Sequence, residues 1–157
     1  MNIVLTAGTF DLLHEGHLNF LQTCRQIAGP DGEVHVWVNE DAFVEKFKHV
    51  RPVHDQYTRL NVIKNLKGVT HAELLKRGDM KRALARTYLV AKDIFHRALG
   101  SRGVNFFVVI GTDWAKRDYY AQIGMTREEL EGLGYKLVYV EYTEGISSTQ
   151  LRAKVQT

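Results

Sequence analysis

The sequence has little cysteine, little proline and no long hydrophobic run, and each scarcity excludes a class of protein. Its 157 residues include one cysteine and two prolines. A single cysteine excludes an internal disulfide framework, and a composition of 45% hydrophobic and 25% charged residues excludes disordered and collagen-like chains. No stretch reaches the about 18 apolar residues that span a bilayer, and the first residues lack the basic start of a secretory signal. We therefore expect a cytoplasmic protein with no membrane association.

Concentrated basic charge is also missing. The net charge is only +3, and no basic stripe with interleaved aromatic residues indicates a nucleic-acid partner. A mild positive charge is compatible with anionic small ligands. The length predicts one domain over residues 1–157.

Short apolar runs alternate along the chain with segments of helical periodicity. Five runs rich in Val, Ile and aromatic residues predict β-strands, namely Ile3–Ala7, Val34–Val38, Val69–Leu75, Phe106–Ile110 and Leu137–Tyr142. Periodicity and capping patterns predict helices at His17–Ala28, Gln56–Leu66, Met80–Leu99, Ala121–Leu133 and Leu151–Val155. This order predicts an α/β fold, a single Rossmann-like parallel five-stranded sheet with helices on both faces. Cys24 falls on the apolar side of the first helix, so we expect it to be buried.

The most informative segment follows the first predicted strand, where proteins with open α/β sheets bind ligands. It reads Gly8-Thr9-Phe10-Asp11-Leu12-Leu13-His14-Glu15-Gly16-His17. Gly8 and Gly16 allow a ligand to approach the backbone, and the predicted helix start offers N–H groups to a phosphate. His14 and His17 are three residues apart, so both can face one anionic centre. By themselves they are also compatible with metal ligation or a structural role.

This block resembles the signature of the nucleotidylyltransferases, most nearly the cytidylyltransferase branch that includes glycerol-3-phosphate cytidylyltransferase. The resemblance extends over essentially the whole chain and implies the HIGH-type nucleotidylyltransferase fold. It implies that His14 and His17 are catalytic and that Asp11 binds the acceptor substrate. It also implies that the nucleotide contacts residues of the same block, namely Gly8, Thr9, Phe10 and Gly16.

Three later segments resemble further motifs of the family. A basic segment from Lys46 to Arg51 leads to Arg59; the plain interpretation is a solvated loop, whereas the resemblance implies that Lys48 and Arg59 are catalytic and bind the acceptor. The other residues that the resemblance implicates in nucleotide binding are Lys46, Asp113, Trp114, Thr143, Ile146, Ser147 and Ser148. The remaining histidines, His35, His49, His54, His71 and His96, are scattered and expected to be surface or structural residues.

The resemblance implies transfer of CMP from CTP to the phosphate of a small polyol or sugar phosphate similar to glycerol 3-phosphate. It further implies Mg²⁺ held mainly by the nucleotide phosphates, no metal site built by the protein, and a homodimer. Tyr142 departs from the pattern, because the cytidylyltransferases have an arginine there and a phenol is neutral at pH 7. Two alternatives stay open: an ATP-dependent adenylyltransferase acting on a sugar phosphate or FMN, and a non-catalytic nucleotide-binding module.

Overall fold

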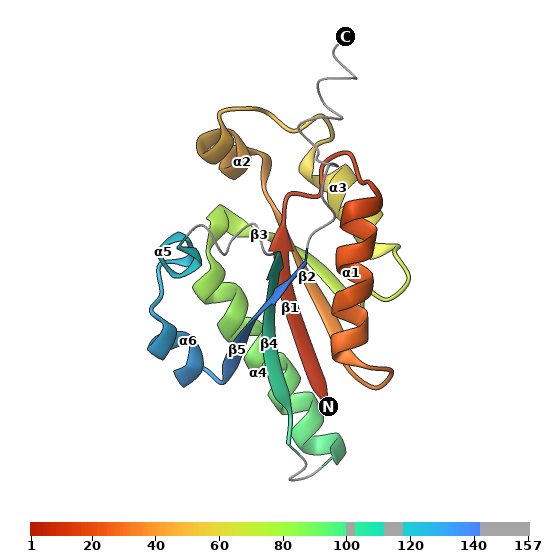
Figure 1. The fold of residues 1–157 in the computed structure, drawn as a ribbon, viewed down its shortest axis with the longest axis vertical. Helices are drawn as coiled ribbons and strands as arrows, with labels where there is room; N and C mark the ends of the chain where they lie inside the picture. Colours follow the sequence, from red (N-terminus) through yellow and green to blue (C-terminus); the bar gives the residue numbers. More distant parts are fainter. Residues whose placement is uncertain (100–102, 112–117, 142–157) are drawn as a thin grey trace.

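The sheet has five strands, all parallel, in the order β3-β2-β1-β4-β5 (Figure 1). The computed structural model describes residues 1–99, 103–111 and 118–141, with the side chains of 92–99 excepted. The strands are β1 Asn2–Gly8, β2 Glu33–Asn39, β3 His71–Leu75, β4 Asn105–Gly111 and β5 Tyr135–Val140. This architecture confirms the predicted α/β fold and its parallel five-stranded sheet. The order in which the strands are added reverses between β1 and β4: β2 and β3 extend the sheet on one side of β1, and β4 and β5 extend it on the other. Ligands bind at such switch points.

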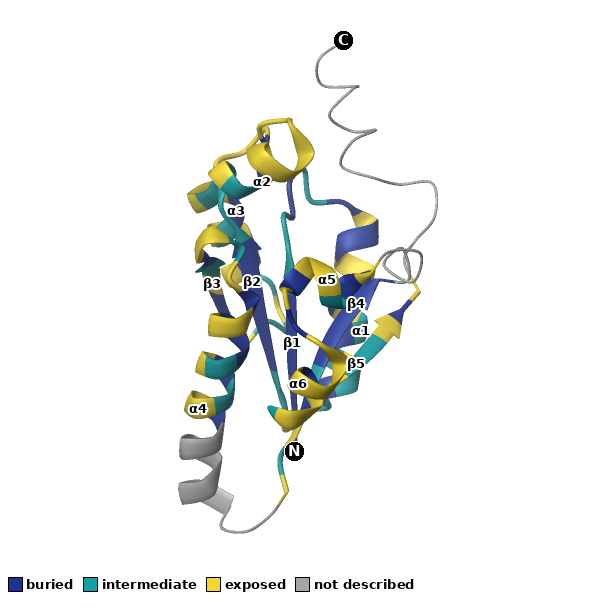
Figure 2. Cartoon of the chain, turned by 90° about the vertical axis from the view of Figure 1, so that its left-hand side faces the viewer, coloured by how far each residue is buried: buried dark blue, intermediate teal, exposed yellow. Residues whose placement is uncertain are grey.

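Helices cover both faces of the sheet, as predicted (Figures 1 and 2). On one face lie α1 and α3, and on the other lie α4, α5 and α6. The helices are α1 Glu15–Ala28, α2 Asp41–Lys48, α3 Gln56–Lys64, α4 Met80–Leu99, α5 Tyr119–Ile123 and α6 Arg127–Gly132, with a 3₁₀ turn η1 at Lys76–Gly78. None of the helices in the described part of the chain is both long and apolar enough to cross a membrane.

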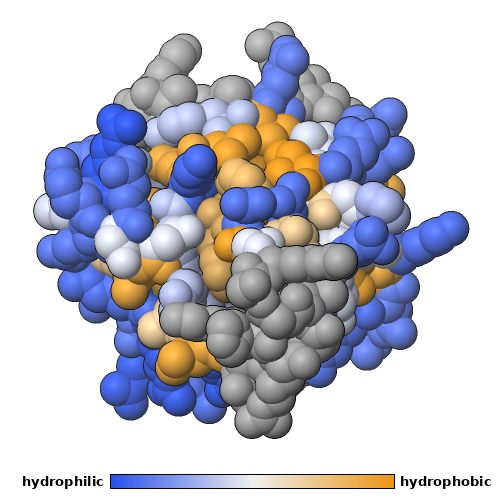
Figure 3. Space-filling view, turned by 90° about the horizontal axis from the view of Figure 1, so that it is seen from below, coloured by the Kyte–Doolittle hydropathy of each residue, from blue (hydrophilic) through white to orange (hydrophobic). Residues whose placement is uncertain are grey.

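The core consists of two apolar layers separated by the sheet. Side chains alternate along β1, so that Ile3 and Leu5 pack toward α4 whereas Val4 packs toward α1. Because β1 is covered on both sides, its middle residues are all buried, which is why the strand reads as a continuous apolar run. Cys24 of α1 is fully buried, as predicted. The opposite end of the molecule from the candidate site, where the strands begin, mixes hydrophobic and hydrophilic side chains on its surface (Figure 3).

The structure corrects two helix predictions. Residues 41–48 form helix α2, although the sequence analysis expected a basic loop around Lys46 and Lys48. The single helix expected over Ala121–Leu133 is two short helices, because Gly124 ends α5 in a left-handed conformation with φ of 67°. Thr126 then caps α6 by accepting a hydrogen bond from the N–H of Glu129, as its capping pattern predicted. The predicted helix at 151–155 lies outside the described residues.

Candidate active site

The candidate site lies at the carboxyl ends of β1 and β2, which point toward α2 and α3 in Figure 1. In the loop between β1 and α1, Phe10 and Leu12 have left-handed backbones, with φ of 53° and 49°. Residues with a Cβ rarely adopt such angles. Backbone strain of this kind persists where surrounding contacts impose it, and it concentrates at functional sites. The loop is therefore held in one conformation by its neighbours.

Histidine side chains cap the start of α1. His14 is the N-cap residue, and its Nδ1 atom accepts a hydrogen bond from the backbone N–H of Gly16 at 3.0 Å. In return, Nδ1 of His17 accepts one from the backbone N–H of His14 at 3.2 Å. The two residues form a capping box in which histidines occupy the positions that Ser or Thr and Glu or Gln usually hold. One nitrogen of each ring is thereby committed to the backbone.

These caps decide which ring nitrogen carries the proton. A neutral imidazole has one N–H donor and one acceptor nitrogen. Because Nδ1 of both rings accepts from a backbone amide, the proton of each neutral ring is on Nε2. Nε2 of His14 is buried and has no hydrogen-bond partner among the described residues. His14 thus offers a buried N–H donor that a ligand would satisfy.

Both imidazoles are neutral near pH 7. Burial lowers the pKa of His14. The pKa of His17 is lowered to about 4, first by burial and then by repulsion from His14 when that ring is protonated and from Lys48, while Asp11 acts in the opposite direction. The two rings stack with their centroids 3.8 Å apart and 24° between their planes. Two neutral donors at this spacing can face one phosphate without the repulsion that two adjacent cations would cause.

Phe10 supports His17 from the side. Its ring meets that of His17 edge-on, with 5.6 Å between centroids and 61° between planes. A Cβ atom at Gly8 would lie 2.9 Å from Cε2 of Phe10. The missing side chain at Gly8 therefore leaves room for the Phe10 ring, which is a packing reason for a glycine that the sequence suggested for ligand approach.

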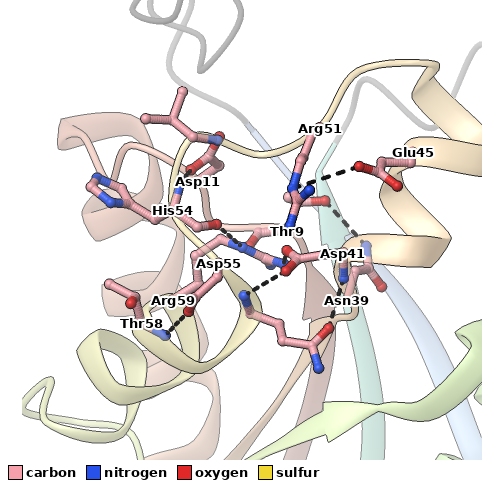
Figure 4. Close-up of polar contacts among 12 residues, drawn as sticks. Thr9, Asp11, Asn39, Asp41, Glu45, Arg51, His54, Asp55, Thr58 and Arg59 are labelled. Atoms are coloured by element: carbon pink, nitrogen blue, oxygen red, sulfur yellow. Dashed lines mark hydrogen bonds and ion pairs between the residues drawn. The ribbon is translucent and has the colours of Figure 1, made fainter.

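Arg59 joins the segments around the site (Figure 4). Its Nη1 donates to the carbonyl of Thr9 at 2.7 Å, its Nε to the carbonyl of His54 at 3.0 Å, and its Nη2 pairs with Oδ1 of Asp41 at 2.7 Å. The residue is only 2% exposed. The guanidinium thus connects the loop after β1 to the start of α2 and to the turn before α3.

Asp11, in the loop after β1, holds the same turn before α3 through hydrogen bonds. Its carboxylate accepts hydrogen bonds from the N–H groups of Val53 and His54, at 2.8 and 3.0 Å. The sequence analysis expected Asp11 and Arg59 to bind the acceptor. The structure instead buries both and directs them at protein groups, since a buried ion requires such partners. These contacts give both residues a positioning role, and their expected contact with the acceptor stays a prediction.

The predicted lysines are exposed on α2. Lys48 is the last residue of α2, and its charge lies close enough to His17 to lower the pKa of that ring. Arg51, beyond the helix, pairs weakly with Glu45, with 3.7 Å between Nε and Oε1. The expected contact of Lys48 with the reacting phosphates stays a prediction, supported by its proximity to His17; that of Lys46 is untested.

The sequence analysis missed the residues that complete this network. Asn39, which ends β2, donates to Oγ1 of Thr9 at 3.3 Å. Asp41 and Gln56 exchange two hydrogen bonds, from N–H of Asp41 to Oε1 of Gln56 at 2.9 Å and from N–H of Gln56 to Oδ2 of Asp41 at 3.1 Å. The available signal was position, because Asn39 and Asp41 follow the second predicted strand just as the histidine loop follows the first.

The remaining predicted contacts lie outside the described residues. They are those of Asp113, Trp114, Thr143, Ile146, Ser147 and Ser148. Their roles stay predictions.

At the described part of the site, the carboxylates of Asp11 and Asp41 accept hydrogen bonds from backbone amides and from Arg59. The expected Mg²⁺ ion, held mainly by the nucleotide phosphates, stays a prediction.

A family model described as cytidylyltransferase-like matches residues 5–154, nearly the full chain. The chain belongs to the cytidylyltransferase-like family. A solved structure of similar fold is the lipopolysaccharide core biosynthesis protein of Thermoplasma volcanium, with a TM-score of 0.66 and 24% identity, covering 92% of this chain and 99% of that one. At that identity the likeness supports the fold alone.

Curated relatives of this cytidylyltransferase-like chain are FAD synthases. That of Korarchaeum cryptofilum is 40% identical over 81 residues, 52% of this chain and 55% of the relative. That of Methanobrevibacter smithii is 40% identical over 74 residues, 47% of this chain and 48% of the relative. The chain thus spans about half the length of the curated relatives that it matches. The glycerol-3-phosphate branch expected from the sequence finds no support in these relatives.

Proposed function

We propose that the chain transfers AMP from ATP to the phosphate of FMN, forming FAD and pyrophosphate. The observation that carries the transfer chemistry is the pair His14 and His17, two neutral rings whose Nδ1 atoms are capped by the backbone and whose N–H donors are on Nε2. The relatives, both FAD synthases, support the choice of ATP and FMN over CTP and glycerol 3-phosphate. Tyr142, which replaces the arginine of the cytidylyltransferases, supports the same choice.

The reaction is an in-line displacement at phosphorus. An oxygen of the FMN phosphate forms a bond to the α-phosphorus of ATP, and the bond from that phosphorus to the oxygen of pyrophosphate breaks. Negative charge on the phosphate oxygens is redistributed in the transition state, where the Nε2–H groups of His14 and His17 donate to it. A preorganised donor of this kind contributes about 3–4 kcal/mol, or 10²–10³ in rate. The backbone caps hold both rings in place before substrate arrives.

Cationic groups complete the proposed site. Lys48 bridges the acceptor phosphate and the α-phosphate, and the positive end of the α1 dipole faces the same charge. Mg²⁺ supplies charge neutralisation to the triphosphate, which carries most of its ligands. The hydroxyl groups of Ser147 and Ser148 bind the departing pyrophosphate, and Asp113 with Trp114 hold the base and ribose.

Exposed apolar side chains favour a flavin as acceptor. Phe47, Val50, Val53 and Tyr57 are 42%, 42%, 41% and 68% exposed. All four come from the segment that carries Lys48 and is fastened to Asp11. A flavin ring system is large and flat, and its apolar dimethylbenzene part would cover such side chains, whereas glycerol 3-phosphate has no apolar ring. Their exposure therefore supports FMN.

A matrix of donors and acceptors tests the proposal. The full chain is incubated with Mg²⁺ and each of ATP, CTP, GTP and UTP, in combination with FMN, glycerol 3-phosphate or a sugar phosphate. Pyrophosphate release and the nucleotide product are measured together. We expect ATP with FMN to give FAD and pyrophosphate in equal amounts, at a rate well above every other pair.

Two outcomes would contradict the proposal in different ways. Faster turnover of CTP with glycerol 3-phosphate would restore the cytidylyltransferase assignment and leave the histidine chemistry intact. Calorimetric binding of a nucleotide without pyrophosphate release, for every acceptor, would identify a nucleotide-binding module instead.

A further inference from the structure

A second polar cluster lies near the start of β2 and β3, away from the histidine pair. His35 of β2 is the direct register partner of His71 of β3. Glu33 precedes His35 by two residues, so its side chain points to the same face of the sheet. The two imidazole rings are 4.6 Å apart between centroids. The sequence analysis treated these histidines as scattered, and parallel strand pairing brings them together.

Both imidazoles approach one carboxylate oxygen. Nε2 of His35 is 2.8 Å from Oε1 of Glu33, and Nε2 of His71 is 3.7 Å from the same atom. One ligand atom from each residue lies within 4.8 Å of the others. A tetrahedral zinc ion with bonds of about 2.0–2.1 Å separates its ligand atoms by about 3.3 Å. Side-chain movements of about 1.5 Å or less would therefore bring all three onto one ion.

The three side chains differ in how far they are exposed, and therefore in how easily they can move to bind a metal ion. The side chain of His35 is 9% exposed and anchored, whereas those of Glu33 and His71 are 22% and 54% exposed and free to adjust. An ordinary ion pair would explain Glu33 with His35 alone, but it gives no reason for His71 to converge on the same oxygen.

A cavity of about 150 Å³ adjoins the pair, lined by both histidines and by residues of β3 and α4 such as Glu73 and Arg86. Arg86 pairs with Glu73 at 3.3 Å, so that carboxylate is partly neutralised. The cavity leaves room beside the imidazoles for water as a further ligand. Three protein ligands with an open position form a common zinc arrangement.

We propose that Glu33, His35 and His71 bind a divalent transition metal ion, zinc by preference, with water from the adjoining cavity as the fourth ligand. The site is separate from the proposed nucleotide site, because His35 precedes Asn39 at the end of β2 by four residues, or about 13 Å of strand. Since β3 is an edge strand, the ion clamps the edge of the sheet to β2.

The test titrates the full chain, freed of metal by a chelator, with Co²⁺ and with Zn²⁺. Visible absorption reports tetrahedral Co²⁺, calorimetry gives the stoichiometry for Zn²⁺, and thermal unfolding gives the stabilisation. We expect one ion per chain and a rise in Tm. His71→Ala and Glu33→Gln should each weaken binding at least about 100-fold. Both residues are at least partly exposed, so these variants keep the fold.

Control variants separate this site from other histidines. His49→Asn changes an exposed histidine in a left-handed position that asparagine tolerates, and it should leave the affinity unchanged. The double variant with His14→Asn and His17→Asn should also keep the Co²⁺ spectrum. Loss of binding in that double variant with retention in His71→Ala would assign the metal to the nucleotide site and overturn the proposal. Absence of binding in the unchanged chain at 100 µM metal would overturn it as well.

Discussion

At the residue scale, His14 and His17 each use their two ring nitrogens for different purposes. Nδ1 satisfies a backbone amide at the start of α1, and Nε2 is left to donate to a ligand. The helix cap therefore sets the tautomer that the chemistry needs, and the two functions cannot be changed independently in a histidine. Amide side chains can separate them, because Asn places an acceptor near Nδ1 and Gln places a donor near Nε2.

His17→Asn should lower kcat by about 10²–10³ with little change in Tm, since it keeps the cap acceptor and loses the Nε2 donor. His17→Gln should retain more activity and keep the stability, since glutamine is a usual residue at this position of a capping box. Steady-state kinetics of FAD formation and thermal unfolding of both variants check this split. A His17→Asn variant with near-normal kcat would remove His17 from the mechanism.

The low pKa of His17 also predicts how stability depends on pH. In the unfolded chain this ring takes up a proton as pH falls below about 6.5, whereas in the folded chain it stays neutral down to about 4. The unfolded state thus binds more protons in this window, so the free energy of unfolding falls as pH falls. His17 alone should account for about 2 kcal/mol between pH 7 and pH 5.

Urea denaturation at pH 5 and pH 7 measures this effect. His17→Asn should show a smaller loss between the two values than the unchanged chain. Burial lowers the pKa of His14 and His35 in the same direction, so part of the loss should persist in the variant. An equal loss in both proteins would show that His17 titrates normally when folded.

At the scale of elements, the site is assembled from the loop after β1, helix α2 and the turn before α3. Helix α2 packs shallowly on the rest of the molecule, because it buries only Val44. Arg59 and Asp11 supply the missing restraint through hydrogen bonds to backbone groups. Helix α2, which carries Lys48, is thereby tied to the histidine loop through Asp41 and Arg59.

Arg59→Ala should lower the free energy of unfolding by about 3–5 kcal/mol, because it leaves Oδ1 of Asp41 and the carbonyl of Thr9 without their charged hydrogen-bond donor. The matched control is Arg51→Ala, whose ion pair with Glu45 is exposed and worth about 0–1 kcal/mol. Urea denaturation measures both. A raised KM for the acceptor with unchanged stability in Arg59→Ala would instead favour direct contact with substrate.

At the scale of the whole molecule, the sheet and its two apolar layers form the rigid support for the site. Cys24 is a probe of this packing, since it is fully buried between α1 and the sheet, and burial raises the pKa of its thiol to about 12.

The homodimer expected from the sequence is not tested by a single chain and stays a prediction.

Cys24 should therefore resist a thiol reagent such as DTNB in the native protein and react as the molecule unfolds. The labelling rate at several urea concentrations should follow the unfolding rate measured by circular dichroism. Because Cys24 is the only cysteine, one thiol per chain should react in full. Rapid labelling without denaturant would show that the α1 layer opens independently of the rest.

Sequence reasoning located the parallel sheet, the long helix α4 and the loop of Gly8 to His17, because each depends on local patterns. The boundaries of α4 match the prediction, since its periodic apolar residues leave no competing assignment. Helix α2 was missed although Phe43, Val44 and Phe47 have helical spacing, because eight residues are a short window for a periodic pattern. The break at Gly124 was missed, although the capping pattern at Thr126 already indicated a helix start there.

The order of strands and helices, the two-histidine loop and the chemistry of its residues follow from sequence alone, since periodicity and turn residues act over a few positions. Only the tertiary structure showed that Arg59 and Asp11 contact protein groups around the site. It also decided that His35 and His71 converge on Glu33. The physical reason is that burial and partner choice depend on residues distant in the chain, which only the folded arrangement of loops, helices and paired strands brings into contact.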